Sequence, residues 1–237
     1  MKNRIKAVVI VIIASMFLAL SSYVNTYYHA LESVTVEIQQ EQYIDDNLLI
    51  FGSKEAKTGM IFYPGGKVEC EAYVPLMKAC AKKDIFCVLI RMPANLAVFN
   101  VDAANGIQDL FPNIKEWYIA GHSLGGAMAA SYVAEHKSVY EGIILLAAYS
   151  TVDLSGLRVL SIYGSEDLVL NREKCREYSS NLPESAMETV IDGGNHAYFG
   201  SYGEQEGDGN AQLSDKEQQK ITANEIEKFI KNKVEKN

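Results

Sequence analysis

The sequence is poor in the residues that build metal sites. It has four cysteines in 237 residues, and no two of them stand in the C-x-x-C spacing that is typical of zinc sites. An acidic loop at 201–215 lacks the D-x-[DN]-x-[DN]-G pattern of calcium-binding loops. We therefore expect neither a metal ion nor a cofactor. We also expect free, mostly buried thiols at Cys70, Cys80, Cys87 and Cys175.

The chain also lacks the surplus of positive charge that nucleic-acid-binding proteins carry. It has 22 Lys and Arg against 30 Asp and Glu, a net charge of −8. Residues 1–26 hold three of the basic residues and no acidic one, which leaves 19 basic against 30 acidic residues, or −11, on residues 27–237. An acidic body of this kind argues against nucleic acid and anionic lipid as its partners.

The N-terminus is the region with a biased composition. Lys2, Arg4 and Lys6 precede an uncharged, mostly apolar run from Ala7 to Val24. A run of about 18 residues is close to the minimum for spanning a bilayer, and the basic flank should stay in the cytoplasm. We expect residues 1–26 to be a single-pass anchor in the cell membrane, with the rest of the chain outside the cytoplasm. A cleaved signal peptide that leaves a secreted protein, and a buried core helix, are the alternatives.

Apolar runs alternate with helical patterns from residue 59 onward. These runs predict strands at 59–66, 85–92, 116–121, 141–150, 157–164 and 187–194 and helices at 71–84, 102–112, 124–136, 171–182 and 214–233. Two earlier strands, expected at 33–39 and 47–52, should form an antiparallel start of the sheet. The later strands are continuously apolar, which indicates a mostly parallel central sheet with helices on both faces. We expect one α/β domain over residues 27–237.

The stretch GHSLGG at 121–126 makes Ser123 a candidate nucleophile. It follows a predicted strand and begins a predicted helix, which is the context of a G-x-S-x-G nucleophile elbow. Gly121 and Gly125 leave room in such a turn, where neighbouring backbone comes close. The helix directs the positive end of its dipole toward the serine, which favours negative charge there.

Four histidines compete for the role of the base. His29 precedes the domain, and His122 is adjacent to the serine, so its side chain should point elsewhere. His136 lies at the far end of the following helix, about 20 Å away. His196 remains, and it comes directly after the last predicted strand. That position puts it at the carboxyl edge of the sheet, where open α/β sheets bind their ligands.

The acid that orients the histidine should follow a strand and lie between the serine and the histidine in the chain. Asp167, in the stretch YGSED, is the predicted acid. Glu166 and Asp153 remain as alternatives, whereas Asp192 is expected to cap a loop.

An oxyanion site needs two backbone N–H groups that point at the developing alkoxide. Leu124, the residue after the nucleophile, is expected to supply one of them. The other should come from the loop after an earlier strand, and residues 62–68 (FYPGGKV) form that loop. Gly66 is the predicted donor, with Lys67 as the alternative.

With these motifs in place, the sequence resembles the α/β-hydrolase superfamily over roughly residues 47–233. The order GHSLGG, YGSED, GGNH is that of the family's Ser–Asp–His triad. The stretches FYPGGKVECEAY, RMPANLAVFN and GGNHAYFGSYGEQEGDG resemble its dienelactone-hydrolase-like branch, the α/β-hydrolase fold-5 group. The resemblance implies that Ser123, Asp167 and His196 are nucleophile, acid and base, and that Leu124 and Gly66 are the oxyanion donors.

One departure from that branch bears on the substrate. Dienelactone hydrolases proper use a cysteine nucleophile, whereas this chain has Ser123, which favours ordinary carboxylic esters. Many hydrolases insert a lid after the strand that ends near Ala148, but here only residues 149–156 lie there. We expect no large lid and an open site with walls from Tyr63, Asn95, Phe99, Tyr149, Tyr198 and Phe199.

The sequence thus predicts a serine hydrolase that acts on a small-molecule ester and is bound to the membrane through its N-terminal segment. The same triad could transfer the acyl group to an acceptor other than water, or cleave amides. A catalytically silent, membrane-anchored binding module is the non-enzymatic alternative.

Overall fold

The computed structural model describes residues 6, 9–16, 18, 22, 26–35, 44 and 47–232. The anchor expected within residues 1–26 lies partly outside this set. Among the residues that are described, no helix combines the length and the apolar character needed to cross a bilayer.

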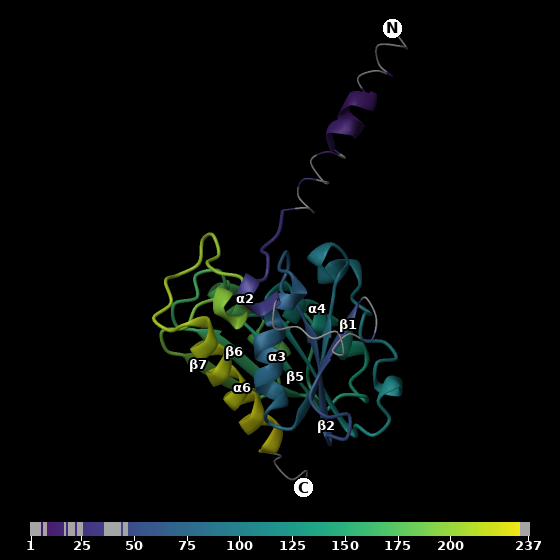
Figure 1. Ribbon diagram of the computed structural model, residues 1–237, viewed down its shortest axis with the longest axis vertical. Coiled ribbons are helices and arrows are strands. Elements are labelled where there is room, and N and C mark those ends of the chain that lie inside the picture. Colours follow the sequence, from purple (N-terminus) through teal and green to yellow (C-terminus); the bar gives the residue numbers. More distant parts are fainter. Residues whose placement is uncertain are drawn as a thin grey trace.

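A seven-stranded sheet forms the centre of the domain (Figure 1). Its strand order is β1-β3-β2-β4-β5-β6-β7, and β1 pairs antiparallel to β3 while the other neighbours are parallel. The mostly parallel sheet with an antiparallel start is confirmed. The strands are β1 (Leu48–Phe51), β2 (Thr58–Tyr63), β3 (Ile85–Ile90), β4 (Glu116–His122), β5 (Gly142–Leu146), β6 (Arg158–Gly164) and β7 (Met187–Ile191).

Helices cover both faces of this sheet. The α-helices are α2 (Glu32–Thr35), α3 (Val74–Ala81), α4 (Leu124–Glu135), α5 (Arg172–Glu177) and α6 (Asp215–Lys231). Short 3-10 helices are η2 (Cys70–Tyr73), η3 (Pro93–Asn95), η4 (Ala97–Phe99), η5 (Gln108–Leu110), η6 (Ser179–Asn181) and η7 (Ala197–Phe199). Helices α3 and α6 pack side by side on one face, and α4 packs on the other.

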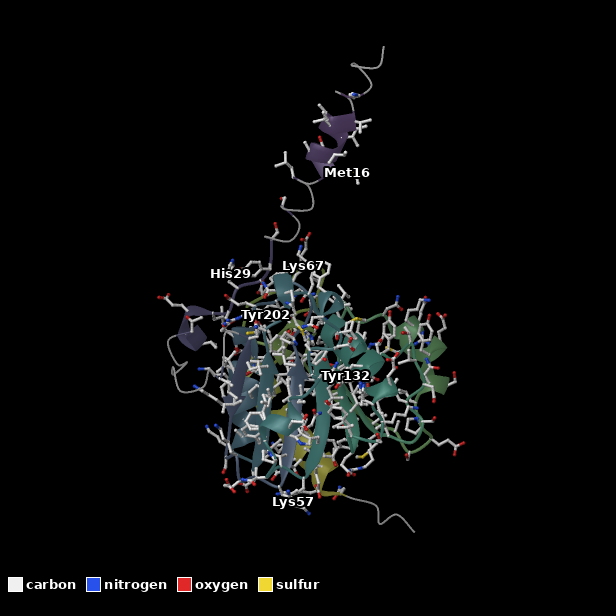
Figure 2. The ribbon with its side chains drawn as sticks, turned by 90° about the vertical axis from the view of Figure 1, so that its right-hand side faces the viewer. Met16, His29, Lys57, Lys67, Tyr132 and Tyr202 are labelled. Carbon is white, nitrogen blue, oxygen red and sulfur yellow. The ribbon has the colours of Figure 1, made fainter. Side chains whose placement is uncertain are left out.

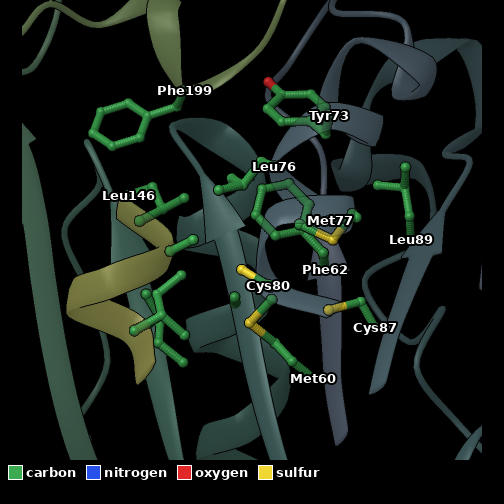
Figure 3. Packing of buried hydrophobic residues seen from close by; sticks show 14 of the residues in the cluster. Met60, Phe62, Tyr73, Leu76, Met77, Cys80, Cys87, Leu89, Leu146 and Phe199 are labelled. Atoms are coloured by element: carbon green, nitrogen blue, oxygen red, sulfur yellow. The ribbon is translucent and has the colours of Figure 1, made fainter. Parts of the chain in front are cut away.

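Alternation along the strands decides which face each side chain joins. In β2, Met60 and Phe62 point into the core under α3 and α6, whereas Ile61 and Tyr63 point into the core under α4. Figure 3 shows the first of these cores, in which Cys80 of α3 and Cys87 of β3 lie among apolar side chains. The four cysteines are free thiols; Cys175 is partly exposed and the others are buried.

Two predicted elements are wrong. The strand expected at 33–39 begins instead as the helical turn α2, in which the amide of Val34 bonds back to the Leu31 carbonyl; residues 36–39 lie outside the described set. The helix expected at 102–112 is a series of turns that ends in η5. The φ of Gly106 is +74° and the amide of Ala104 bonds to the Tyr63 hydroxyl, so no continuous helical ladder forms there.

The carboxyl ends of the parallel strands meet at one end of the molecule. Figure 2 places Lys67, in the loop after β2, at the same end as His29, while Lys57, just before β2, lies at the opposite end. The connection 147–157 between β5 and β6 contains no helix or strand, as expected for a site without a large lid. The loops that follow β2, β4, β5, β6 and β7 therefore share one edge.

Candidate active site

Ser123 lies between the last residue of β4 and the first residue of α4. Its φ of 51° and ψ of −123° are strained for a residue with a side chain. A hydrogen bond of 2.9 Å from the Ser123 amide to the Leu146 carbonyl fixes this turn to the end of β5. The turn therefore has the local geometry of a nucleophile elbow.

The helix after the serine begins in close contact with the loop after β2. A Cβ on Gly125 would lie 2.1 Å from the Pro64 carbonyl oxygen and 2.4 Å from that of Tyr63. Real Cβ atoms do not approach backbone so closely, so only glycine allows α4 to start here. The G-x-S-x-G spacing thus serves packing as well as the turn.

Asp167 and His196 are hydrogen-bonded to each other in the interior. The distance from Asp167 Oδ2 to His196 Nδ1 is 3.0 Å, and the two residues are 3% and 2% exposed. The other carboxylate oxygen, Oδ1, accepts hydrogen bonds from the amides of Val169 (2.9 Å) and Leu170 (2.8 Å). The carboxylate therefore has partners on both oxygens, which suits a buried anion.

Two buried amide side chains hold the histidine loop against helix α6. Gln218 Oε1 accepts from the Asn195 amide at 3.0 Å, and Gln218 Nε2 donates to the Asn195 carbonyl at 2.8 Å. The Asn195 side chain accepts from the Tyr198 amide and donates to the Gly209 carbonyl. The backbone on both sides of His196 is thus fixed by hydrogen bonds.

Asp208 joins the histidine loop to the loop that carries the acid. Its Oδ2 accepts from the Ala197 amide at 2.9 Å, and its Oδ1 accepts from the amides of Gly209 at 2.8 Å and Leu168 at 3.3 Å. One carboxylate therefore contacts the residue after His196 and the residue after Asp167.

The two predicted oxyanion donors, the amides of Leu124 and Gly66, belong to neighbouring residues. Leu124 is the first residue of α4, so its amide has no partner within the helix. Gly66 packs against the side chain of Leu124, because a Cβ on Gly66 would lie 2.7 Å from Leu124 Cδ2. Among the described residues, neither amide has a hydrogen-bond acceptor. The alternative donor, the amide of Lys67, bonds to the Asn95 carbonyl at 2.7 Å and is excluded.

Ser123 and His196 line one open cavity of about 270 Å³. Its other lining residues are small or apolar, apart from one tyrosine and one asparagine: Leu124, Ala127, Ala147, Ala148, Tyr149, Val169, Leu170 and Asn171. The arrangement brings a hydroxyl, an imidazole backed by a carboxylate, and two free amides to the same edge of the sheet. Such a set can carry out nucleophilic acyl transfer.

A sequence model of the alpha/beta hydrolase family matches residues 59–220. The chain belongs to this family. A comparison with curated protein sequences found no match.

Solved structures with the same fold include hydrolases of several organisms. A CIB-like hydrolase of Thermoplasma acidophilum is 17% identical, with a TM-score of 0.54 over 76% of this chain and 91% of the other. Est1E of Butyrivibrio proteoclasticus is 13% identical, with a TM-score of 0.59 over 80% and 96%. A monoacylglycerol lipase of Paleococcus ferrophilus is 10% identical, with a TM-score of 0.60 over 78% and 100%. At these identities the likeness establishes the fold.

Most of the expected pocket walls of this alpha/beta hydrolase lie elsewhere. Of the six residues, Tyr149 lines the cavity described above, where it stacks on Tyr178. Tyr63 is fully buried under α4, and its hydroxyl donates to the Val101 carbonyl, so its predicted role was wrong. Phe199 is likewise fully buried in the core under α3 and α6.

The other three predicted wall residues do not line this cavity either. Asn95 uses its backbone carbonyl to hold the loop of Gly66, and Phe99 is 58% exposed at the surface. Tyr198 is partly buried beside Asn195, to which its amide donates. The cavity walls come instead from the first turn of α4 and from the loops after β5 and β6.

The alternative acids have other partners. Asp153 is exposed and forms an ion pair with Lys137 at 3.0 Å, and hydrogen bonds from Ser155 and Lys137 lower its pKa to about 2. Glu166 accepts from the Ser165 hydroxyl at the surface. His136 bonds to the Tyr132 carbonyl, away from the serine.

Sequence reasoning missed the residues that hold the loops, namely Asn195, Asp208 and Gln218. Asn195 had a visible signal, since it directly precedes the histidine in GGNH. Asp208 was hidden in an acidic stretch that reads as a solvated loop. Gln218 lies on a helix far along the chain, and its pattern gives no sign of a buried polar role.

Proposed function

We propose that this alpha/beta hydrolase cleaves carboxylic esters through an acyl-enzyme on Ser123. The observation that carries the proposal is that Ser123 and His196 line the same cavity while His196 Nδ1 bonds to Asp167. A serine beside an oriented imidazole is the arrangement that activates a hydroxyl for attack on an acyl carbon.

In the first half of the reaction, His196 Nε2 takes the proton of the Ser123 hydroxyl as its oxygen attacks the ester carbonyl. Asp167 holds the imidazole in the tautomer with its proton on Nδ1 and stabilises the imidazolium. The amides of Leu124 and Gly66 donate to the oxyanion, and each such donor is worth about 10²–10³ in turnover. His196 then protonates the leaving alcohol.

In the second half, His196 removes a proton from water, which attacks the acyl carbon and releases the acid. The Ser123 oxygen takes its proton back from His196. The proposed mechanism uses side chains and backbone amides of this chain for every step.

The size and lining of the cavity suit a substrate with a small, uncharged acyl or alcohol group. Its volume of about 270 Å³ lies just below the range of about 300–1,000 Å³ that is usual for drug-sized ligands. Its lining is mostly aliphatic around the reacting groups. Solved neighbours described as esterase and lipase act in the same reaction class.

The test is a panel of p-nitrophenyl esters with increasing acyl length. We expect hydrolysis that declines as the acyl chain outgrows the cavity, and a loss on the order of 10⁶ in kcat in Ser123→Ala. Ser131→Ala is the matched control, because Ser131 lies further along α4 and its hydroxyl bonds to the Ala127 carbonyl.

Other outcomes would separate the alternatives. Ester product formed with an added alcohol acceptor would indicate acyl transfer, and activity on amides alone would indicate an amidase. A folded protein that hydrolyses no ester and transfers no acyl group would support the binding module.

We also propose that residues 1–26 hold the domain of residues 27–237 at the outer face of the cell membrane. The basic flank and the apolar run of the sequence support this proposal. Fractionation tests it: full-length protein in the membrane pellet is expected, whereas a secreted form that lacks residues 1–21 would support signal cleavage.

A further inference from the structure

His122 is a buried histidine that the proposed reaction does not use. It ends β4, directly before Ser123, and is 1% exposed. Because strand side chains alternate, His122 points into the core under α3 and α6, to the same side as Tyr118 and Ala120. It therefore lies behind the nucleophile and needs a separate explanation.

Two hydrogen bonds connect His122 to the loop of the predicted oxyanion donor. The Gly65 amide donates to Tyr73 Oη at 3.0 Å, and Tyr73 Oη lies 2.8 Å from His122 Nδ1. Since the Tyr73 oxygen already accepts from Gly65, its own proton is left for Nδ1. This assigns Nδ1 of His122 as an acceptor and puts the ring proton on Nε2.

The surroundings keep both members of this pair neutral. Burial lowers the pKa of His122 well below its ordinary value, and the nearby His196 lowers it further, while an interaction with the His196 backbone acts in the opposite direction. Burial likewise raises the pKa of Tyr73, so its hydroxyl keeps its proton. Tyr73 is fully buried.

The other side of the His122 ring faces the base. The ring centroids of His122 and His196 are 4.6 Å apart, and Phe199 lies 5.5 Å from His122. Figure 3 shows Tyr73 and Phe199 together at one end of the core, beyond Leu76 and Leu146.

We propose that Tyr73 and His122 form a relay that positions the oxyanion loop and the catalytic base relative to each other. The inference rests on the proposed function of Ser123 and His196. Tyr73 fixes Gly65 and with it the adjacent Gly66 amide, and the His122 ring supports one side of the His196 imidazole. Both are positioning residues, and neither touches the reacting atoms.

A neutral His122 has a further consequence for the reaction. His196 becomes positively charged when it takes the serine proton, and a second charged imidazole next to it would repel that charge. The hydroxyl of Tyr73 on Nδ1 stabilises the uncharged ring. The relay thus stabilises the transition state in two ways. It holds the Gly66 amide and His196 in position, and it keeps His122 uncharged beside the positive charge that forms on His196.

The first test is Tyr73→Phe, which removes the hydroxyl and keeps the ring. We expect kcat for a short-chain ester to fall about 10- to 100-fold with little change in KM, since misplacing groups by about an ångström can cost that much. Tyr118→Phe is the control: Tyr118 is buried in the same core as Tyr73 and lies on β4, the strand of His122, and its hydroxyl accepts from Arg158. Equal losses in both variants would overturn the relay.

A double-mutant cycle separates the relay from two independent effects. His122→Phe removes the acceptor and keeps an aromatic ring in place. The relay predicts that Tyr73→Phe/His122→Phe loses no more activity than the worse single variant, because the shared contact is already broken. Losses that multiply would overturn the proposal.

The third test does not depend on ester hydrolysis. In protein labelled with ¹⁵N-histidine, the His122 ring of the wild type should carry its proton on Nε2 from about pH 5 to about pH 8, where an ordinary histidine titrates. A proton on Nδ1, or titration in that range, would overturn the relay. If the wild type hydrolyses no ester, the proposed function fails, and this ring assignment alone decides for or against the Tyr73–His122 pair.

Discussion

At the scale of single residues, the site depends on a few backbone atoms held at unusual positions. Ser123 keeps a positive φ because its amide bonds to Leu146 and because Gly125 lets the helix approach Pro64. These constraints are local in sequence, which explains why the GHSLGG stretch was enough to predict the turn. Asp167 and His196 lie far apart in the sequence. Their contact was predicted instead from the order of the two residues in the chain and from their positions after strands.

The buried, neutral His122 predicts a specific effect of pH on stability. Its pKa in the folded protein lies below the value of about 6.5 that it has in the unfolded chain. Between these two values the unfolded chain binds a proton that the folded protein does not. The free energy of unfolding should therefore fall as the pH drops below about 6.5, by at most about 1.4 kcal/mol per pH unit from this residue.

Urea unfolding at about pH 5 and about pH 7 measures this effect. In His122→Phe the difference between the two pH values should be smaller than in the wild type, because the titrating group is gone. An unchanged difference would show that His122 does not contribute to it.

At the scale of elements, the sheet was predictable and two peripheral segments were not. The strands β2, β3 and β5 are buried along their whole length, so their sequences are continuous apolar runs. The run at 33–39 has the β-branched residues of a strand. The structure nevertheless places the start of this run in the helical turn α2, and Val34 of this turn packs in the core under α3 and α6. Tertiary contacts outweigh local propensity in such short segments.

Asp208 connects the loop of His196 to the loop of Asp167, so replacing it tests whether this connection matters for activity. Asp208→Ala removes acceptors from the amides of Ala197, Gly209 and Leu168. We expect a loss of about tenfold or more in kcat on a short-chain ester, since the relative position of the base and its acid is no longer fixed. Steady-state kinetics with this substrate measures the loss.

Glu204→Ala is the matched control for Asp208→Ala. Glu204 is an exposed carboxylate in the same acidic loop. Activity close to the wild type is expected there. If both variants lose activity equally, the effect comes from the charge or mobility of the loop, and the bridging role of Asp208 is refuted.

The residues that line the candidate pocket could not be predicted from the sequence, whereas the triad could. A strand residue such as Tyr63 goes to one face or the other by its position in the register, and the register put it in the core under α4. The residues that line the cavity, such as Ala147 and Leu170, are small or aliphatic and resemble ordinary core residues in the sequence. Pocket walls therefore depend on the tertiary fold.

At the scale of the whole molecule, residues 26–35, which precede the sheet, are hydrogen-bonded to the domain. The Tyr28 amide donates to the Lys67 carbonyl at 2.8 Å, and the Glu69 amide donates to the Tyr28 carbonyl at 2.9 Å. The Leu31 amide donates to the Ser201 carbonyl at 2.9 Å. These bonds fasten the segment to the loops at the active-site edge (Figure 2).

Two shortened chains test this attachment. A chain that starts at residue 27 keeps these bonds and should retain the melting temperature and kcat of the full-length protein in detergent. A chain that starts at residue 36 loses them, which frees the loop of Gly66, so it should melt lower and turn over more slowly. Equal behaviour of the two chains in thermal melts and ester assays would contradict this role.

Covalent trapping of the nucleophile shows directly whether Ser123 is the residue that His196 activates. The folded protein is treated with a short-chain alkyl phosphonate ester, and the modified peptide is identified by mass spectrometry. We expect one phosphonyl group on Ser123, formed quickly in the wild type and far more slowly in His196→Ala. A folded wild type without an adduct, or with the adduct on another residue, would contradict this expectation.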